Sequence, residues 1–279
     1  MVPDGESRLA IALSTAGIAV VNGIFERAAF IDLARHQMSI VRHRDAGPDG
    51  VTVLRPRHGS AIDELGFSRA ELAPHTDGAQ LNQPPGVLAL ACVKPAVSGG
   101  ETVIVDMAAV HDALAIIDPV ALRRLYMPDV ARFSGRGSAV FARSGERVTV
   151  RWRDDSLAEF SPDDAAVVSR LRQIIDEHRV VFRLKQGQVL FVSNSRFLHG
   201  RLRFEGRRLL YRILGYPRPD IGFQPGFAPP ISDSSFRAVP FQAIAPARKL
   251  PATAPTGLRP QPSNVPRYPR DEEKVYECP

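Results

Sequence analysis

Two side chains that suit a metal ion stand two residues apart in the segment Ala73-Pro-His75-Thr-Asp77-Gly78. Residues i and i+2 of an extended segment point to the same side, so His75 and Asp77 can present an imidazole and a carboxylate to one ion. A pair of this type also arises easily by chance, and the chain contains a second one, His43-Arg-Asp45. The residues that follow each pair therefore have to distinguish them.

A further imidazole that could complete a site lies in the segment Asn194-Ser-Arg196-Phe-Leu-His199-Gly200-Arg201. Two imidazoles and one carboxylate on one face of a metal, with the opposite positions open, are typical of non-haem Fe(II) enzymes that bind a co-substrate and dioxygen together. Zinc uses the same ligand types. The spacing alone does not decide between the two metals.

Four blocks of sequence carry a resemblance to a known family. They are His75-Thr-Asp77-Gly78, Gly99-Gly-Glu-Thr102 after an apolar run, Asn194 to Arg201, and Arg207-Arg208-Leu-Leu-Tyr-Arg212. In this order, over most of residues 17–217, the chain resembles the Fe(II)/2-oxoglutarate-dependent dioxygenases of the taurine dioxygenase and clavaminate synthase type. The pair at His43 has no Gly-Gly-x-Thr block at a matching distance, so we favour the pair at His75.

The resemblance implies a cofactor set and a reaction. Position by position, His75, Asp77 and His199 match the family's Fe(II) ligands, and Thr102 and Arg208 match the residues that hold the distal carboxylate of 2-oxoglutarate. With O2, such enzymes convert 2-oxoglutarate to succinate and carbon dioxide and hydroxylate an unactivated C–H bond of a second substrate. Desaturation or cyclisation on the same machinery is the alternative outcome.

The second substrate is expected to be small or medium in size and to carry an anion, such as an amino acid or a biosynthetic intermediate. Arg212 matches a position that binds an acidic group of the substrate in several relatives, and it shares a strand face with Arg208. Leu81 and Phe204 lie near the ligand blocks and can equally line a site for a neutral, apolar substrate. The doublet Arg207-Arg208 also leaves open which guanidinium faces the co-substrate.

The elements that must position these residues are mainly short strands, because apolar runs alternate with Gly and Pro. Strands are predicted at 18–21, 51–54, 87–93, 102–105, 130–133, 139–143, 147–152, 180–184, 189–192 and 209–214. Helices are predicted at 6–14, at 25–38, at 106–127 with a break at Pro119, and from the N-cap Ser161 to about His178. The segment around His43 is expected to be a solvated loop.

The expected fold is mostly β with helices: a double-stranded β-helix, or jelly-roll, with helices packed outside it. A helical insertion is expected at about 106–184. One dioxygenase domain would span residues 1–250, with its core at 17–217. Of the 24 prolines, 14 lie in the last 63 residues, which predicts a mobile tail at 251–279. The segment 223–244 is expected to dock on the body.

Composition restricts the class of partner. The net charge is +6, but only four of the 36 basic residues are Lys and the Arg residues are scattered, so an anionic small molecule is favoured over nucleic acid. No apolar run approaches the ~18 residues of a membrane span, and acid stands near the N-terminus where a secretory signal needs base, so we expect a cytoplasmic protein. Cys92 and Cys278 have neither disulfide nor metal spacing. The oligomeric state is left open.

Two other functions are compatible with parts of this pattern. One is a non-catalytic jelly-roll protein that binds an anionic ligand, and the other is a basic protein that interacts through its tail. The complete set of metal and co-substrate residues favours the enzyme over both.

Overall fold

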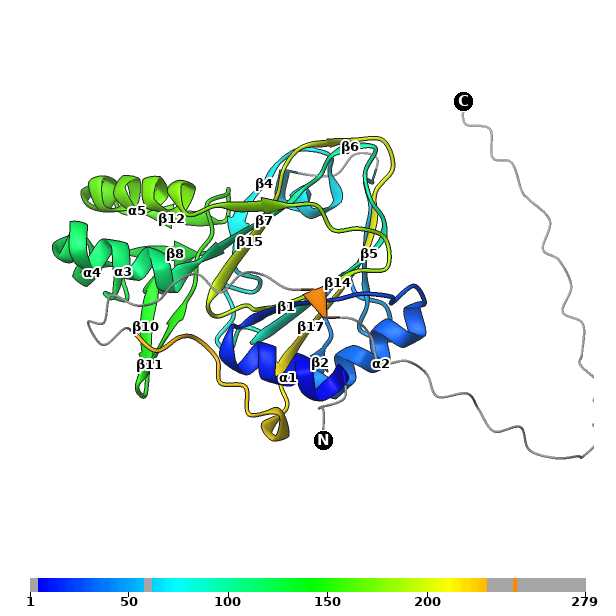
Figure 1. The fold of residues 1–279 in the computed structure, drawn as a ribbon. Helices are drawn as coiled ribbons and strands as arrows, with labels where there is room; N and C mark the ends of the chain where they lie inside the picture. Colours follow the sequence, from blue (N-terminus) through cyan, green and yellow to red (C-terminus); the bar gives the residue numbers. More distant parts are fainter. Residues whose placement is uncertain (1–4, 58–61, 230–242, 245–279) are drawn as a thin grey trace, which may run out of the picture. The chain divides into compact units, whose positions relative to one another are not determined.

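Two β-sheets form the core of this computed structural model, which describes residues 5–57, 62–229 and 243–244 (Figure 1). The larger sheet has the order β18-β1-β14-β5-β17-β2, with β3 also paired to β17. Its strands are β1 (Ile18–Val21), β2 (Met38–Val41), β3 (Thr52–Leu54), β5 (Val87–Lys94), β14 (Val189–Ser193), β17 (Leu209–Pro217) and β18 (Ala243–Ile244). The smaller sheet has the order β13-β7-β15-β4 and consists of β4 (Leu72–His75), β7 (Thr102–Asp106), β13 (Val180–Phe182) and β15 (Phe197–Arg201).

Apolar side chains of both sheets meet between them. Leu88 and Leu190 of the larger sheet belong to one buried cluster with Ile104 and Phe197 of the smaller sheet. The pairing is antiparallel apart from that of β1 with β18, and neighbouring strands are often distant in sequence, as β14 between β1 and β5 illustrates. The predicted jelly-roll fold is confirmed.

Strand β17 shows why the sequence alternates as it does. Leu210 and Leu214 belong to the cluster between the sheets, whereas Ile213 belongs to a cluster on the opposite face. That outer cluster includes Leu9 of α1 (Gly5–Thr15) and Phe30 of α2 (Arg27–Gln37). The two helices therefore cover the outside of the larger sheet (Figure 1).

The insertion between β7 and β13 forms a hydrophobic cluster, which includes its Met107, Trp152 and Leu171 and also Val105 of β7 and Leu198 of β15. Its helices are α3 (Met107–Ile117), α4 (Pro119–Leu125) and α5 (Ala165–Glu177). Its strands are β8 (Ala131–Phe133), β9 (Arg136–Ser138), β10 (Phe141–Ser144), β11 (Arg147–Val150) and β12 (Ala158–Phe160). The predicted break at Pro119 is confirmed, since the Asp118 carboxylate accepts a hydrogen bond from the Ala121 N–H at 2.9 Å and starts a new helix.

Several predicted boundaries differ from the structure. The helix predicted at 25–38 ends at Gln37, because Met38 begins β2 and pairs with Pro217. That pairing extends β17 three residues beyond the predicted end of the last strand. Ser161 caps the short 3-10 helix η2 (Pro162–Asp164) rather than α5. The two-residue strands β6 (Ser98–Gly99) and β16 (Phe204–Glu205) were not predicted.

The chain after β17 is described only in part. A 3-10 helix, η3 (Pro219–Ile221), follows the strand, and Phe223 and Phe227 are buried, as expected for a docked segment. The predicted mobile tail at 251–279 lies outside the described residues. The segment between β3 and β4 contains the 3-10 helix η1 (Ile62–Phe67). Within the described ranges, no helix is long and apolar enough to cross a membrane.

Candidate metal centre and co-substrate pocket

The two histidines of the predicted triad lie opposite each other on neighbouring strands. His75 is the last residue of β4 and pairs with His199 of β15, with 4.5 Å between the ring centroids. Gly200 permits this approach, because a Cβ atom there would lie 2.7 Å from the Leu72 carbonyl oxygen. The glycine after His199 is therefore required by the close contact between β15 and β4.

The Asp77 carboxylate completes the triad. Its Oδ1 lies 3.9 Å from His75 Nε2, and its Oδ2 lies 3.4 Å from His199 Nε2. One ligand atom from each of the three residues lies within 4.8 Å of the others. Two imidazole nitrogens and one carboxylate oxygen at this separation fit the donor set of a non-haem Fe(II) site.

Hydrogen bonding prepares His75 as a ligand. Its Nδ1 lies 2.9 Å from the Ala73 carbonyl oxygen, which has no proton to give, so Nδ1 is the donor. The Nε2 lone pair then faces Asp77. Burial is the largest cause that lowers the pKa of His75, and the neighbouring His199 is the second. The pKa falls to about 4, so the ring is neutral at pH 7.

Asn194 holds the backbone that carries Asp77. Its Oδ1 accepts a hydrogen bond from the Asp77 N–H at 2.8 Å, and its Nδ2 donates to the Asp77 carbonyl at 2.9 Å and to the Pro85 carbonyl at 2.7 Å. The Asn194 side chain is buried, so these bonds are shielded from water. The sequence placed Asn194 in a motif, but nothing in it indicated this contact.

Arg212 lies beside the Asp77 carboxylate. Its Nη1 is 3.0 Å from Asp77 Oδ1 and 3.3 Å from Oδ2. Burial raises the pKa of Asp77, but Arg212 and the two imidazoles outweigh burial and hold that pKa well below its usual range. Asp77 is therefore an anion at neutral pH, as a metal ligand must be.

His43 lies in a loop, as expected, but its side chain is only partly exposed to solvent. The His43 side chain is 33% exposed, and its Nδ1 accepts a hydrogen bond from the Asp45 N–H at 3.2 Å. The pKa of His43 is lowered, mainly by burial and then by the positive charge of Arg212, whereas the negative charge of Asp77 raises it. His43 thus lies near the triad, although the metal cluster of the described residues does not include it.

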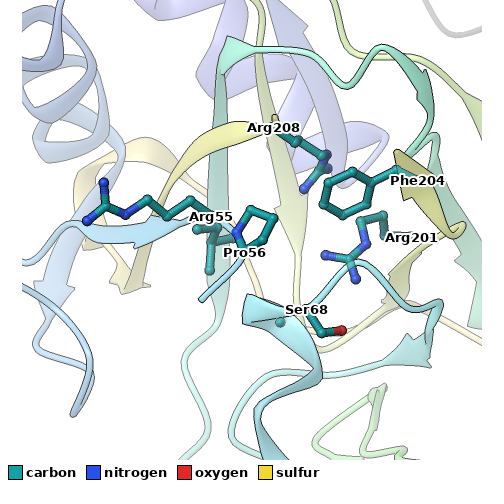
Figure 2. Close-up of a pocket in the computed structure, with 8 residues that line it drawn as sticks. Arg55, Pro56, Ser68, Arg201, Phe204 and Arg208 are labelled. Carbon is teal, nitrogen blue, oxygen red and sulfur yellow. The ribbon is translucent and has the colours of Figure 1, made fainter. Parts of the chain in front are cut away.

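A pocket beside β15, the strand that carries His199, is lined by Arg208, which is assigned to the co-substrate, and by Arg201 (Figure 2). Within the Arg207-Arg208 doublet, Arg208 is buried and lines the pocket, whereas Arg207 is exposed. Phe204 is buried and lines the same pocket, with its ring centroid 5.6 Å from the Arg208 guanidinium. Thr102 is 2% exposed, and its Oγ1 is buried with no hydrogen-bond partner among the described atoms.

Leu81, the other residue considered for an apolar substrate site, is 44% exposed in the loop that follows Gly78. Arg151 holds this loop, since its guanidinium donates to the carbonyl oxygens of Leu81 at 2.8 Å and of Asn82 at 3.0 Å. The Tyr216 hydroxyl donates to the next carbonyl, that of Gln83, at 2.9 Å. The loop is therefore anchored at Leu81 and at the two residues that follow it.

Sequence comparison gives curated relatives of two kinds. The chain is 26% identical over 172 residues to the mitochondrial trimethyllysine dioxygenase of Gallus gallus, a match that covers 53% of this chain and 41% of that protein. It is 26% identical over 173 residues to the gamma-butyrobetaine dioxygenase of Homo sapiens, which covers 54% of this chain and 45% of that protein. The chain thus spans less than half of the length of these two relatives.

Comparison of folds finds non-haem iron oxygenases. A crystal structure of asparagine oxygenase with Fe(II), 3-hydroxyasparagine and succinate superposes with a TM-score of 0.63 and 16% identity, covering 75% of this chain and 78% of the other. The iron oxygenase OrfP with iron and alpha-ketoglutaric acid gives a TM-score of 0.58 at 18% identity, over 77% and 80% of the two chains. At these identities the likeness concerns the jelly-roll fold.

The family comparison covers most of the chain. Residues 3–214 match the family described as "Taurine catabolism dioxygenase TauD, TfdA family", and this range contains the triad, Thr102 and both Arg208 and Arg212. The match includes both sheets up to β17 and the whole insertion. The chain therefore belongs to the taurine catabolism dioxygenase TauD, TfdA family.

Proposed function

We propose that this protein is an Fe(II)- and 2-oxoglutarate-dependent oxygenase that hydroxylates an unactivated C–H bond of a small substrate. The supporting observation is the cluster of His75, Asp77 and His199, together with a pocket that is lined by the buried Arg208 and by Arg201 of the strand that carries His199. Family membership supports the same activity. The balanced reaction is 2-oxoglutarate plus O2 plus R–H giving succinate, carbon dioxide and R–OH. We propose a single catalytic domain over residues 1–250.

The residues of the triad would hold the iron through His75 Nε2, His199 Nε2 and one oxygen of Asp77. Ferrous iron, when bound, supplies the redox chemistry that activates O2 for oxidative decarboxylation. The protein keeps the His75 imidazole available as a neutral ligand and the Asp77 carboxylate anionic, through the pKa shifts of both groups. Three protein ligands leave positions for the co-substrate and for O2.

Arg208 and Thr102 would bind the distal carboxylate of 2-oxoglutarate. A guanidinium can make a bidentate, charge-assisted pair with a carboxylate, and the Thr102 hydroxyl can donate one further hydrogen bond. Both side chains are at least nine-tenths buried, so the bound carboxylate would be shielded from water. Shielding strengthens each of these bonds and keeps water away from the reacting centre.

The second substrate is proposed to be an amino acid or a related carboxylate. The asparagine oxygenase and OrfP structures contain hydroxylated amino acids, which supports this class for a protein of the same fold. Arg212 contributes positive charge near the triad, and its Nε is buried and unpartnered among the described residues. This nitrogen is the donor that an anionic group of the substrate could use while Nη1 stays on Asp77.

The test is succinate formation from 2-oxoglutarate with Fe(II) and O2, measured against a panel of amino acids, other carboxylic acids and neutral metabolites. We expect an amino acid or another acid to raise the rate, and we expect His199→Ala to abolish turnover. His36→Ala, which changes an exposed histidine, is the matched control. Turnover by His199→Ala at the rate of the unchanged protein would contradict the proposed function.

A further inference from the structure

The strand that carries His199 also carries a buried arginine. Arg201 is the last residue of β15, two positions after His199, so both side chains point to the same face of the smaller sheet. Arg201 pairs with Thr102 of β7 in the antiparallel ladder. Side chains of directly paired residues lie about 5 Å apart at Cβ and on the same face. Arg201 is therefore a direct neighbour of Thr102.

Arg201 and Arg208 lie against the same aromatic ring. The centre of the Arg201 guanidinium is 4.8 Å from the Phe204 ring centroid, and that of Arg208 is 5.6 Å from it. Figure 2 shows both guanidinium groups beside Phe204 on one side of the pocket, with Arg55 extending away from it. Phe204 thus fixes two cations next to one cavity.

Both arginines are buried without a matching anion. Arg201 is 5% exposed and Arg208 9% exposed, and no carboxylate whose side chain the structure describes forms a salt bridge with either. An arginine guanidinium keeps its charge throughout the neutral pH range. Two buried cations without an anion cost free energy that a bound carboxylate would offset.

Hydrogen bonds that hold the fold together use only some of the donors of Arg201. Its Nη2 donates to the carbonyl oxygens of Leu65 and Ala70, which ties β15 to the segment around η1. Its Nε is buried and has no partner among the described atoms. The Oγ1 of Thr102 is likewise buried and has no hydrogen-bond partner among the described atoms. Two neighbouring buried groups therefore have unused hydrogen-bonding capacity beside Arg208.

From this arrangement we infer that Arg201 is a second guanidinium donor to the distal carboxylate of 2-oxoglutarate, together with Arg208 and Thr102. The inference rests on the proposed function and adds a co-substrate-binding residue to it. Its chemical consequence is selectivity for 2-oxo acids that end in a carboxylate, because an uncharged end would leave both buried cations unpaired.

The test compares two five-carbon 2-oxo acids, 2-oxoglutarate and 2-oxopentanoate, which lacks the distal carboxylate. Their dissociation constants are measured by calorimetry on the Mn(II)-loaded protein, in which no turnover occurs. Arg201→Met should weaken 2-oxoglutarate binding at least about tenfold, as expected when one partner of a buried charged pair is lost. Binding of 2-oxopentanoate should change much less, so the preference for the dicarboxylate should fall.

Arg203→Met is the matched control, because Arg203 is exposed on the same turn and should leave both constants unchanged. Arg201→Lys keeps the charge and replaces the Met variant in the test if that variant does not fold. It should also weaken the binding of 2-oxoglutarate more than that of 2-oxopentanoate, because an ammonium lacks the planar arrangement of donors of a guanidinium. If Arg201→Met or Arg201→Lys keeps the full preference while Arg208→Met loses it, Arg201 only braces the fold and the inference is wrong. If the unchanged protein does not bind 2-oxoglutarate, the proposed function itself fails.

Discussion

Arg212 Nη1 lies 3.0 Å from Oδ1 and 3.3 Å from Oδ2 of Asp77, so the carboxylate proposed to bind iron already has a counter-charge. The side chains are 14% and 10% exposed, which makes this a buried ion pair. Removing one partner of such a pair leaves an uncompensated charge in a medium of low polarity. Arg212 therefore affects the metal site directly, whatever it contributes to substrate binding.

Arg212→Leu should destabilise the metal-free protein by about 3–5 kcal/mol, since Asp77 loses its counter-charge. A divalent cation would replace that charge, so metal should stabilise the variant more than it stabilises the unchanged protein. The measurement is the thermal unfolding midpoint with and without Mn(II). Arg207→Leu, at an exposed arginine, is the control. An equal effect of metal on both proteins would refute the electrostatic role of Arg212.

Asn194→Ala should weaken metal binding by loosening Asp77. The substitution leaves the Asp77 N–H and two carbonyl groups without partners, at about 1–3 kcal/mol for each buried group. Asn194→Asp keeps the acceptor for the N–H but loses both donors, so we expect an effect at least as large. Competition with a metal indicator gives the dissociation constant. Asn82→Ala, in an exposed loop position, should leave it unchanged.

Arg208→Met should raise the dissociation constant of 2-oxoglutarate well over tenfold, because losing one partner of a buried charged pair costs about 2–5 kcal/mol. Arg207→Met should have little effect, since Arg207 is exposed while Arg208 lines the pocket. Calorimetry on the Mn(II)-loaded variants measures both constants. A loss of 2-oxoglutarate binding in Arg207→Met, with normal binding in Arg208→Met, would show that Arg207 and not Arg208 binds the co-substrate.

Cys92 should be unreactive in the folded protein at pH 9. It is buried, and burial raises the pKa of its thiol from 9.0 to about 11. A raised pKa means that the thiol's contribution to stability is complete below pH 9 and is lost as the pH rises towards 11. Alkylation by iodoacetamide, followed by mass spectrometry in a Cys278→Ser background, should therefore be slow until about pH 11. Fast alkylation of the folded protein at pH 8 would contradict this burial.

The residues that the sequence could predict are those whose geometry depends on local spacing. The i, i+2 spacing of His75 and Asp77, and the alternation along β17, follow from extended backbone alone. Apolar runs and helix caps predicted the strands and the helical insertion, and the family resemblance implied the jelly-roll. Family resemblance supplied the remaining site residues.

The features that the sequence did not indicate depend on contacts between distant segments. Asn194 and Asp77 are 117 positions apart, and Arg212 and Asp77 are 135 positions apart, so no local pattern predicts either bond. His43 was assigned to solvent because its neighbours in sequence are charged turn residues. Its true surroundings include Arg212 and Asp77, which come from other elements.

The most direct test of the metal centre is equilibrium dialysis of the protein against Fe(II) without oxygen. We predict one Fe(II) per chain in the unchanged protein and in His43→Ala, because His43 is outside the ligand cluster of the described residues. His75→Ala, Asp77→Ala and His199→Ala should each lose the bound iron while remaining folded. A full equivalent of tightly bound Fe(II) in the His199→Ala variant would contradict the account.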